Sequence, residues 1–283
     1  MRRLWSIPIA VAAIVLLAWC GDGGRESTPT PTPSPCPPGE IYRSANLDGH
    51  AVDAECNPGG AQSCPCTRDD VALKVLPTHA EVTSNPRGNQ TWVNAIGYKK
   101  FTSQLPDGCA NLVARFRYSG RFRLPVVPRQ NVNQEQNPDA AHAMIQYWDA
   151  TTKNTIEGTI FLDLNPWRTC DTADGTMAVR IYETSSSSSL ALWDTGLRLP
   201  CDTTWHTFKL EVDLVTRQYL SIAIDAQSRD LTAHQLAQVH QSTWTGESFL
   251  SLTTESEAAW PQSDCRNVFW WTTEFADVVL ERL

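Results

Sequence analysis

Three tryptophans stand where an aromatic side chain could contact a ligand. Trp148, Trp167 and Trp193 each adjoin a polar turn, and nine of the 11 tryptophans lie beyond the first 20 residues. A flat apolar ring beside hydrogen-bonding side chains suits a sugar, which is apolar on its faces and hydroxylated at its rim. The polar neighbours that we expect on the same surface are Gln146, Arg180 and Asp194. The alternative for all three rings is packing inside a core.

Two carboxylates share one face of a strand predicted over residues 155–164. Glu157 and Asp163 have the same parity, but six residues of strand place them about 20 Å apart, too far to act together on one bond. Catalysis would therefore need a partner from another strand. The sequence also lacks a Gly-x-Ser-x-Gly elbow, a phosphate-binding loop and a His-Glu-x-x-His helix. These patterns favour binding over catalysis and leave an enzyme open.

A row of arginines alternates with apolar residues. Arg115 and Arg117 fall between apolar positions, and Arg121 and Arg123 continue the same parity past Gly120. This pattern predicts a strand with one core face and one charged face. The charged face is either a solvated or edge-protecting surface, or a surface for acidic polysaccharide or phosphate, which arginine binds through its planar fork.

The start of the chain indicates export. Two arginines follow Met1, an uncharged apolar stretch of 16 residues comes next, and together they predict a signal peptide over residues 1–20. Leu17, Ala18 and Cys20 resemble the lipobox of bacterial lipoproteins, in which cleavage leaves the cysteine lipidated; Trp19 departs from that pattern. Residues 21–40 predict an extended Pro/Thr/Ser-rich linker. The resemblance implies a chain on the outer face of a bacterial membrane, lipid-anchored or secreted, with an uncleaved transmembrane anchor as the alternative.

The cysteines fit an oxidising environment. Eight of the nine remain once Cys20 is set aside, and an even number in an exported chain predicts up to four disulfides. We expect Cys170 to pair with Cys201 and Cys109 with Cys265. Zinc is the alternative for Cys56, Cys64 and Cys66, but their spacing is wrong and no histidine stands nearby.

The composition narrows the class of protein. The chain has 283 residues, of which 41% are hydrophobic and 19% charged, which excludes a disordered or fibrous chain. Its net charge of −8 argues against nucleic acid as a partner. The length allows one large domain with appendages, or two domains.

Alternating strands separated by turns position these residues. Residues 41–70 predict a loop-rich, Cys-rich collar, and residues 71–283 predict a single β-domain, with a short helix at 232–241. About eleven strands with almost no helix predict an all-β sandwich of two antiparallel sheets. The expected strands are 92–101, 111–118, 143–149, 155–164, 176–183, 190–194, 205–214, 217–225, 248–254, 267–271 and 275–283.

The second half of the chain resembles a known fold. Residues 205–212 and 219–225, joined by a turn, resemble paired strands of concanavalin A-like lectins, laminin G-like domains and family 16 glucanases, and residues 275–280 look like their closing strand. The resemblance implies a two-sheet jelly-roll sandwich over residues 71–283. It also implies a structural Ca²⁺ at the position of Asp277. A fold of this kind does not fix an activity.

The catalytic pattern of family 16 is only partly matched. That family carries Glu-x-Asp-x-x-Glu on one strand, and this sequence has Glu211, Asp213 and then Thr216 in place of the second glutamate. The acid partner required by retaining hydrolysis is missing, and the stretch lies in a strand that is not the family's catalytic one. We therefore expect no catalytic role for these residues.

Together these observations predict a cell-surface carbohydrate-binding or adhesion protein whose partner is a polysaccharide or a cell-surface glycan. One alternative is a glycoside hydrolase or polysaccharide lyase with non-standard catalytic residues. The other is a structural subunit of a cell-surface assembly. No cofactor is expected apart from the structural Ca²⁺.

Overall fold

A computed structural model describes residues 36–58, 67–85, 90–125, 137–163, 176–184, 190–241, 243–259 and 271–283. Contacts divide the chain into residues 1–35 and a compact unit from Cys36 to Leu283, and only the second is described. The predicted signal peptide, the lipidation at Cys20 and most of the linker lie outside the described residues. Within the described residues, no helix is long and apolar enough to cross a membrane.

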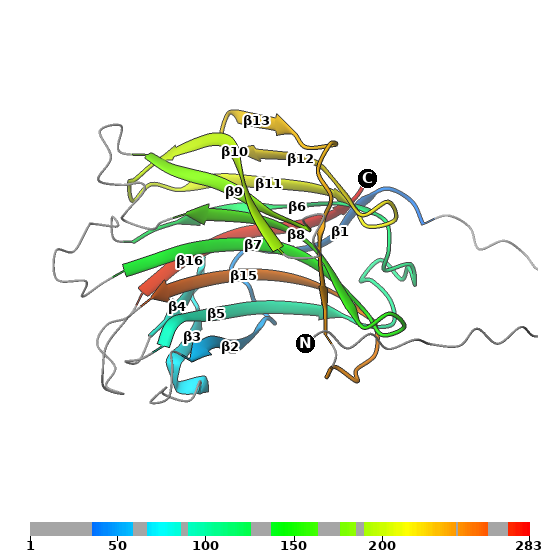
Figure 1. Ribbon diagram of the computed structural model, residues 1–283, viewed down its shortest axis with the longest axis horizontal. Helices are drawn as coiled ribbons and strands as arrows, with labels where there is room; N and C mark the ends of the chain where they lie inside the picture. Colours follow the sequence, from blue (N-terminus) through cyan, green and yellow to red (C-terminus); the bar gives the residue numbers. More distant parts are fainter. Residues whose placement is uncertain are drawn as a thin grey trace, which may run out of the picture. The chain divides into compact units, whose positions relative to one another are not determined.

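Two antiparallel sheets form this unit (Figure 1). Sheet A has the order β13-β12-β11-β6-β16-β4-β3, with β1 on β16, and sheet B has the order β10-β9-β8-β7-β15-β5-β2, with β14 on β8. The strands of sheet A are β1 (Gly39–Ser44), β3 (Val71–Val75), β4 (Ala80–Ser84), β6 (Arg115–Arg123), β11 (His206–Asp213), β12 (Gln218–Ile224), β13 (Gln227–Asp230) and β16 (Trp271–Arg282). Those of sheet B are β2 (Ala51–Pro58), β5 (Gln90–Phe101), β7 (Asn137–Asp149), β8 (Asn154–Asp163), β9 (Thr176–Thr184), β10 (Leu190–Pro200), β14 (Ala237–His240) and β15 (Phe249–Ala259). The predicted jelly-roll sandwich is confirmed.

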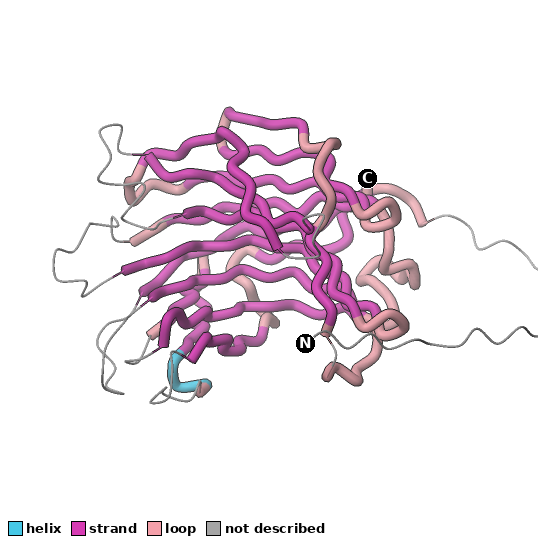
Figure 2. The backbone as a smooth tube through the Cα atoms, viewed as in Figure 1, coloured by secondary structure: helices cyan, strands magenta, loops and turns pink. Residues whose placement is uncertain are grey.

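Helix is nearly absent from the described residues, as Figure 2 shows. Among the residues that the structure describes, one 3-10 turn is present, Arg68–Asp70, and it precedes β3. The helix predicted over residues 232–241 is wrong, because Ala237–His240 pairs with Glu157–Asn154 of β8 as a strand. The apolar spacing was too short to decide between the two structures, and pairing with a distant strand decided it.

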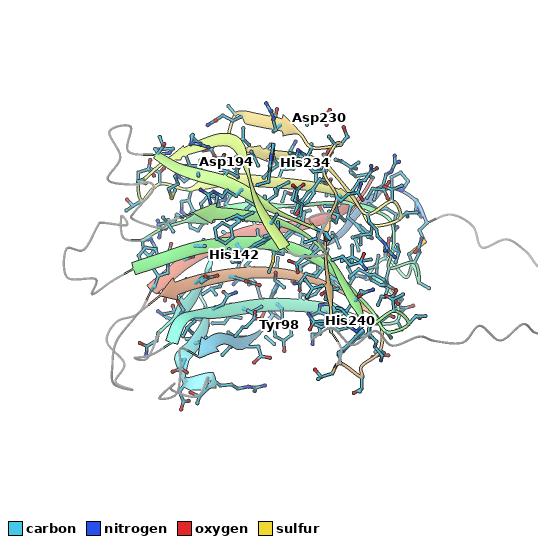
Figure 3. All side chains as sticks on the ribbon, in the orientation of Figure 1. Tyr98, His142, Asp194, Asp230, His234 and His240 are labelled. Atoms are coloured by element: carbon cyan, nitrogen blue, oxygen red, sulfur yellow. A yellow bond between two sulfur atoms is a disulfide. The ribbon has the colours of Figure 1, made fainter. Side chains whose placement is uncertain are left out.

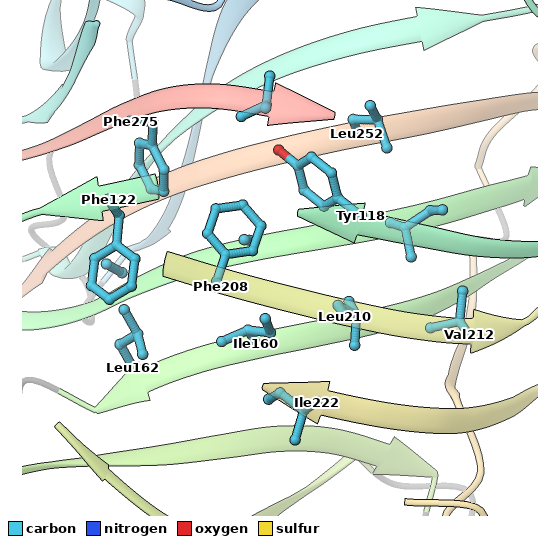
Figure 4. Close-up of a cluster of buried hydrophobic side chains, with 14 of the residues drawn as sticks. Tyr118, Phe122, Ile160, Leu162, Phe208, Leu210, Val212, Ile222, Leu252 and Phe275 are labelled. Atoms are coloured by element: carbon cyan, nitrogen blue, oxygen red, sulfur yellow. The ribbon is translucent and has the colours of Figure 1, made fainter. Parts of the chain in front are cut away.

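The core lies between the facing sides of the sheets. In β6 the predicted alternation is present: Phe116, Tyr118 and Phe122 are buried, while the arginines between them face outward. Figure 4 shows Tyr118, Phe208 and Phe275 converging in this core, and the rings of Tyr118 and Phe208 meet edge to face at 5.3 Å. Sheet A therefore presents a largely apolar face to sheet B.

Two glycines allow close packing in this core. A Cβ on Gly158 of β8 would lie 2.5 Å from a methyl of Val212 on the opposite sheet. A Cβ on Gly120 of β6 would lie 2.8 Å from the ring of Phe208, on the neighbouring strand of the same sheet. A larger residue would overpack either contact, so the separation of the sheets depends on Gly158 and the position of the Phe208 ring on Gly120.

The residues predicted as a loop-rich collar contribute strands to the sandwich itself. β1 pairs with the last strand, β16, in sheet A, and β2 pairs with β5 in sheet B. The turn between them places neighbouring stretches of sequence in opposite sheets. Short strands without a clear apolar pattern gave no periodic signal, and their partners lie far away in sequence.

The disulfide at Cys109 differs from the predicted one. Cys109 is bonded to Cys36, with Cα atoms 5.9 Å apart, so the predicted pair with Cys265 is wrong. Connectivity cannot be read from a sequence without the chain path that brings two cysteines together. Cys201 is disulfide-bonded as well; Cys170 lies outside the described residues, and that pairing stays a prediction.

The arginine row on the outer face of sheet A is matched by carboxylates of the adjacent strands. Arg117 binds Glu211 of β11 at 2.7 Å and Glu281 of β16 at 3.1 Å. The other three arginines pair likewise: Arg115 with Asp213, Arg121 with Asp277 and Arg123 with Glu274. These salt bridges, called the arginine ladder below, neutralise the arginine row. The structure therefore supports the solvated-face interpretation over a surface for acidic polysaccharide or phosphate.

Candidate functional groove on sheet B

The outward face of sheet B is hollowed into an open groove with a volume of about 650 Å³. Four alternate residues of β7 run along its floor: His142, Met144, Gln146 and Trp148. Alternate residues of a strand share a face, and the six residue steps from His142 to Trp148 make this floor about 20 Å long. The groove is therefore long and shallow, with different chemistry at its two ends.

Buried acids and a histidine form one end. Register pairs Glu255 of β15 with His142 of β7, and the carboxylate Oε2 of Glu255 lies 3.0 Å from His142 Nδ1. The side-chain amide of Asn94, on β5, donates to the same oxygen. Glu257 follows on the same face of β15, 3.5 Å from His142 Nε2. Figure 3 labels His142 on β7 and Tyr98 on β5, the two strands that pair with β15 on either side.

Glu157 carries a buried carboxyl group whose pKa is raised toward neutrality. Burial raises the pKa of Glu157 to about 7, a hydrogen bond from Gln146 Nε2 at 2.9 Å opposes the rise, and the nearby carboxylates of Glu255 and Glu55 add to it. Glu55 keeps an exposed side chain on β2, yet desolvation and the charge of Glu255 raise its pKa too. Carboxyls with shifted pKa values in a cleft are typical of functional sites.

Three aromatic rings form the other end. Trp148 stacks on Phe249 with ring centroids 5.3 Å apart and an angle of 17° between the planes. Trp244 packs edge-on against Trp148 at 5.4 Å, and Trp148 and Trp244 are both only half-buried. Lys100 lies 4.7 Å from the centre of the Phe249 ring. The result is an aromatic shelf, made of Trp148, Trp244 and Phe249, beside hydrogen-bonding side chains.

The residues singled out in the sequence are only partly brought together. Trp148 and Gln146 line the groove, and Trp148 Nε1 donates to Gln146 Oε1 at 3.5 Å. Arg180 faces the same way at the far edge, in the cross-strand row that links Glu255, His142, Phe161, Arg180 and Asp194. Asp194 is exposed and paired with Arg198 at 2.8 Å.

Trp193 has the opposite orientation. It pairs in register with the buried Ile181 and packs against the core, its ring 4.0 Å from that of His234. It does not line the groove. Trp167 lies outside the described residues.

Two other tryptophans differ from each other in burial. Trp271 is buried, whereas Trp205 lies half-exposed on the outer face of sheet A. The guanidinium groups of Arg121 and Arg123 sit over its ring at 5.0 and 4.8 Å. Trp205 therefore covers the arginine row rather than a sugar.

The partial family 16 pattern lies on the sheet that has no part in this groove. Glu211 and Asp213 belong to β11 of sheet A, where Arg117 and Arg115 bind them. Hydrogen bonds from Ser221 and Arg117 outweigh the effect of burial and lower the pKa of Glu211. An ionised, paired carboxylate on the outer face of sheet A fits no role in the groove.

The residues around Asp277 do not fit the expected calcium site. The carboxylate of Asp277 accepts a hydrogen bond from Arg121 Nε at 2.7 Å. Calcium takes six to eight oxygen ligands, and here a guanidinium holds the carboxylate that the resemblance would assign to the ion.

The sequence reasoning missed the acid end of the groove. Glu255 and Glu257 fell beyond the end of the strand predicted over residues 248–254, and His142 fell just before the strand predicted over residues 143–149. The signal was present, because polar residues keep one parity from Ser251 to Glu257. A strand extended by three residues would have placed both glutamates on the polar face.

Solved structures similar to this chain include glycoside hydrolases and an alginate lyase, all at very low sequence identity. LamAcat from Zobellia galactanivorans is 8% identical, over 86% of this chain and 97% of that one, with a TM-score of 0.43. The alginate lyase Aly36B, solved with alginate trisaccharide, is 11% identical over 85% and 98%, with a TM-score of 0.44. A laminarinase catalytic domain from Thermotoga petrophila is 9% identical over 87% and 98%, with a TM-score of 0.42. No family model matches the sequence, and neither does any curated protein.

Proposed function

We propose that the groove on sheet B binds a polysaccharide chain. The observation that carries the proposal is the union, in one groove, of an aromatic shelf with buried hydrogen-bonding groups. Sugar rings stack on aromatic faces while their hydroxyls bond to polar side chains. An open groove about 20 Å long along β7 suits a polymer rather than a small enclosed ligand.

The charge of the groove favours a neutral glycan. Five carboxylic acids line it, against one lysine, Lys100. A polyuronate would bring further negative charge beside Glu255 and Glu257, and like charges in a partly desolvated site repel strongly. The same repulsion disfavours a polysaccharide lyase acting on uronates, since such a site must neutralise the substrate's carboxylate.

Replacing Trp148 tests this proposal. Trp148→Ala should weaken binding of the best neutral polysaccharide in a soluble panel by about 1 to 3 kcal/mol, the range for losing a stacked ring. The measurement is affinity electrophoresis followed by calorimetry. Trp205→Ala is the matched control, because it removes the same side chain from the opposite sheet. If no glycan binds, or both variants bind equally, the groove is not the binding site.

Hydrolysis of the bound glycan is a second candidate, favoured by the state of Glu157. A buried carboxyl with a pKa of about 7 can donate a proton to a leaving oxygen. Glu255, held by Asn94 and His142, is the candidate second carboxylate. Glu157→Gln and Glu255→Gln should each lower the release of reducing ends by about 100-fold or more, while Glu211→Gln leaves it unchanged. Binding without any release would leave a carbohydrate-binding protein.

The proposed location is the cell surface, through a lipid on Cys20. The apolar start, the partial lipobox and the Pro/Thr spacer support this proposal. Mass spectrometry of the intact protein from its native membrane should find residues 1–19 absent and acyl mass on Cys20. An N-terminus at Met1 would instead indicate a transmembrane anchor.

A further inference from the structure

The outer face of sheet A brings two carboxylates together at the β4–β16 pair. Register places Glu81 of β4 directly opposite Glu274 of β16. Like charges directly opposite each other on neighbouring strands are destabilising. Glu274 is nearly buried, its side chain 7% exposed, so solvent screens it little. Positive charge close to both carboxylates would stabilise this pair.

A histidine completes the cluster. His79 stands in the turn between β3 and β4, where its carbonyl accepts a hydrogen bond from the backbone N–H of Leu76 at 2.8 Å. Its Nε2 lies 3.8 Å from Glu274 Oε1, beyond hydrogen-bond distance. One ligand atom each from His79, Glu81 and Glu274 all lie within 4.8 Å of one another.

Glu81 and Glu274 lie in a cross-strand row between Lys74 and Arg123. These two cations bind only one oxygen of each carboxylate. Lys74 Nζ binds Glu81 Oε2 at 3.2 Å, and Arg123 binds Glu274 Oε2. Glu274 Oε1 faces His79 instead. On the other side of the imidazole, Nδ1 lies 3.1 Å from Thr78 Oγ1. Ligands of a metal are commonly oriented in this way, with partners on the atoms that do not bind the ion.

We propose that His79, Glu81 and Glu274 bind a zinc ion. One imidazole nitrogen and two carboxylate oxygens are ligands that Zn²⁺ accepts, and two carboxylates balance its charge. Tetrahedral ligands at 2.0–2.1 Å from zinc lie about 3.4 Å apart. His79 Nε2 and Glu274 Oε1 therefore need to approach by only a few tenths of an ångström. Water fills the fourth position, since the described protein groups supply three ligands.

The site joins the edge of sheet A to its centre. Glu81 and His79 belong to the β3–β4 hairpin, which pairs with the rest of the sheet only through β16. A bound ion would link this hairpin to β16 by side chains as well as by the backbone ladder. The site is separate from the groove, which sheet B supplies.

Calorimetric titration of zinc into the full, disulfide-intact protein tests the proposal, after treatment with a chelator and removal of any affinity tag. One zinc ion per chain should bind. His79→Ala should weaken binding by about 100-fold or more, because a direct ligand matters at least as much as a supporting residue, and Glu81→Gln should weaken it too. His234→Ala is the matched control, since His234 also pairs with a glutamate, Glu183, outside this cluster.

Two outcomes overturn the proposal: no zinc binding, or binding that His79→Ala and His234→Ala affect equally. A misfolded variant would be recognised from its thermal unfolding without metal. X-ray absorption of the zinc complex gives an independent readout. It should find nitrogen and oxygen ligands at about 2.0 Å without sulfur, and a sulfur shell would place the ion at cysteines instead.

Discussion

The outer faces of the two sheets carry charge in opposite arrangements. On sheet A, every arginine of β6 meets a carboxylate of a neighbouring strand. On the groove side of sheet B, His142 lies beside Glu255 and Glu257, and the charges of Glu255 and Glu55 raise the pKa of the buried Glu157 further. Paired charges on a solvent-exposed face change stability little. Clustered like charges reduce stability, and groups of this kind are typical of functional sites. The difference points to sheet B as the functional face.

The largest expected effect comes from Glu157. The carboxyl binds a proton more tightly in the folded chain, with a pKa of about 7, than at its usual value of 4.5, so stability falls as the pH rises from about 4.5 to 7. Glu157→Gln removes this loss. We expect it to be more stable than the wild type by about 3 kcal/mol at pH 8.5 and equal to it at pH 4, measured by urea unfolding.

Glu211→Gln on sheet A sharpens that result because its sign is reversed. Arg117 and Ser221 lower the pKa of Glu211, so its contribution is present above the usual pKa and is lost as the pH falls through the lowered value. The variant should be less stable than the wild type at pH 7, by no more than about 1 kcal/mol, and the difference should shrink in acid. If the two substitutions changed the free energy of unfolding with the same dependence on pH, the contrast between the two faces would be wrong.

An effect between those of Glu157→Gln and Glu211→Gln is expected from breaking the arginine ladder at its centre. Arg117→Ala leaves Glu211 and Glu281 without their shared cation, and should cost about 1 to 2 kcal/mol of unfolding free energy at low salt. The cost should diminish at high ionic strength. Glycan binding should not change, and a change would connect the outer face of sheet A with the groove.

The smallest effect concerns calcium. Because Arg121 already holds the carboxylate of Asp277, calcium added to chelator-treated protein should leave the melting temperature unchanged. Asp277→Ala should reduce stability by no more than about 1 kcal/mol. A rise in melting temperature that calcium produces and Asp277→Ala abolishes would restore the site implied by the fold resemblance.

The alternation of residues predicted the faces, and the pairing of strands decided the site. β6 could be assigned a core face and an arginine face because the period of two is local. His142 and Glu255 are 113 residues apart, and their contact depends on the register between β7 and β15. No local pattern encodes that register. The same holds for the carboxylates that neutralise Arg117, which come from two different strands.

Trp193 shows the limit of reasoning from neighbouring turns. It adjoins a polar turn as Trp148 does, yet it is one residue out of phase with the groove side of β10, where Asp194 has the parity of Arg180. A shift by one residue moves a side chain to the opposite face. Sequence proximity to a turn therefore could not separate a ligand surface from the core.

The bond between Cys36 and Cys109 has a mechanical consequence. β1 is the first strand and lies antiparallel on β16, so tension applied to the chain ahead of it would otherwise unzip it one residue at a time. The disulfide enters the fold before β1 begins, and Arg282 at the end of β16 binds both Pro37 and Asp107 beside it. A pull from a surface tether would pass through the covalent bond into the loop ahead of β6. The strand would bear none of the load.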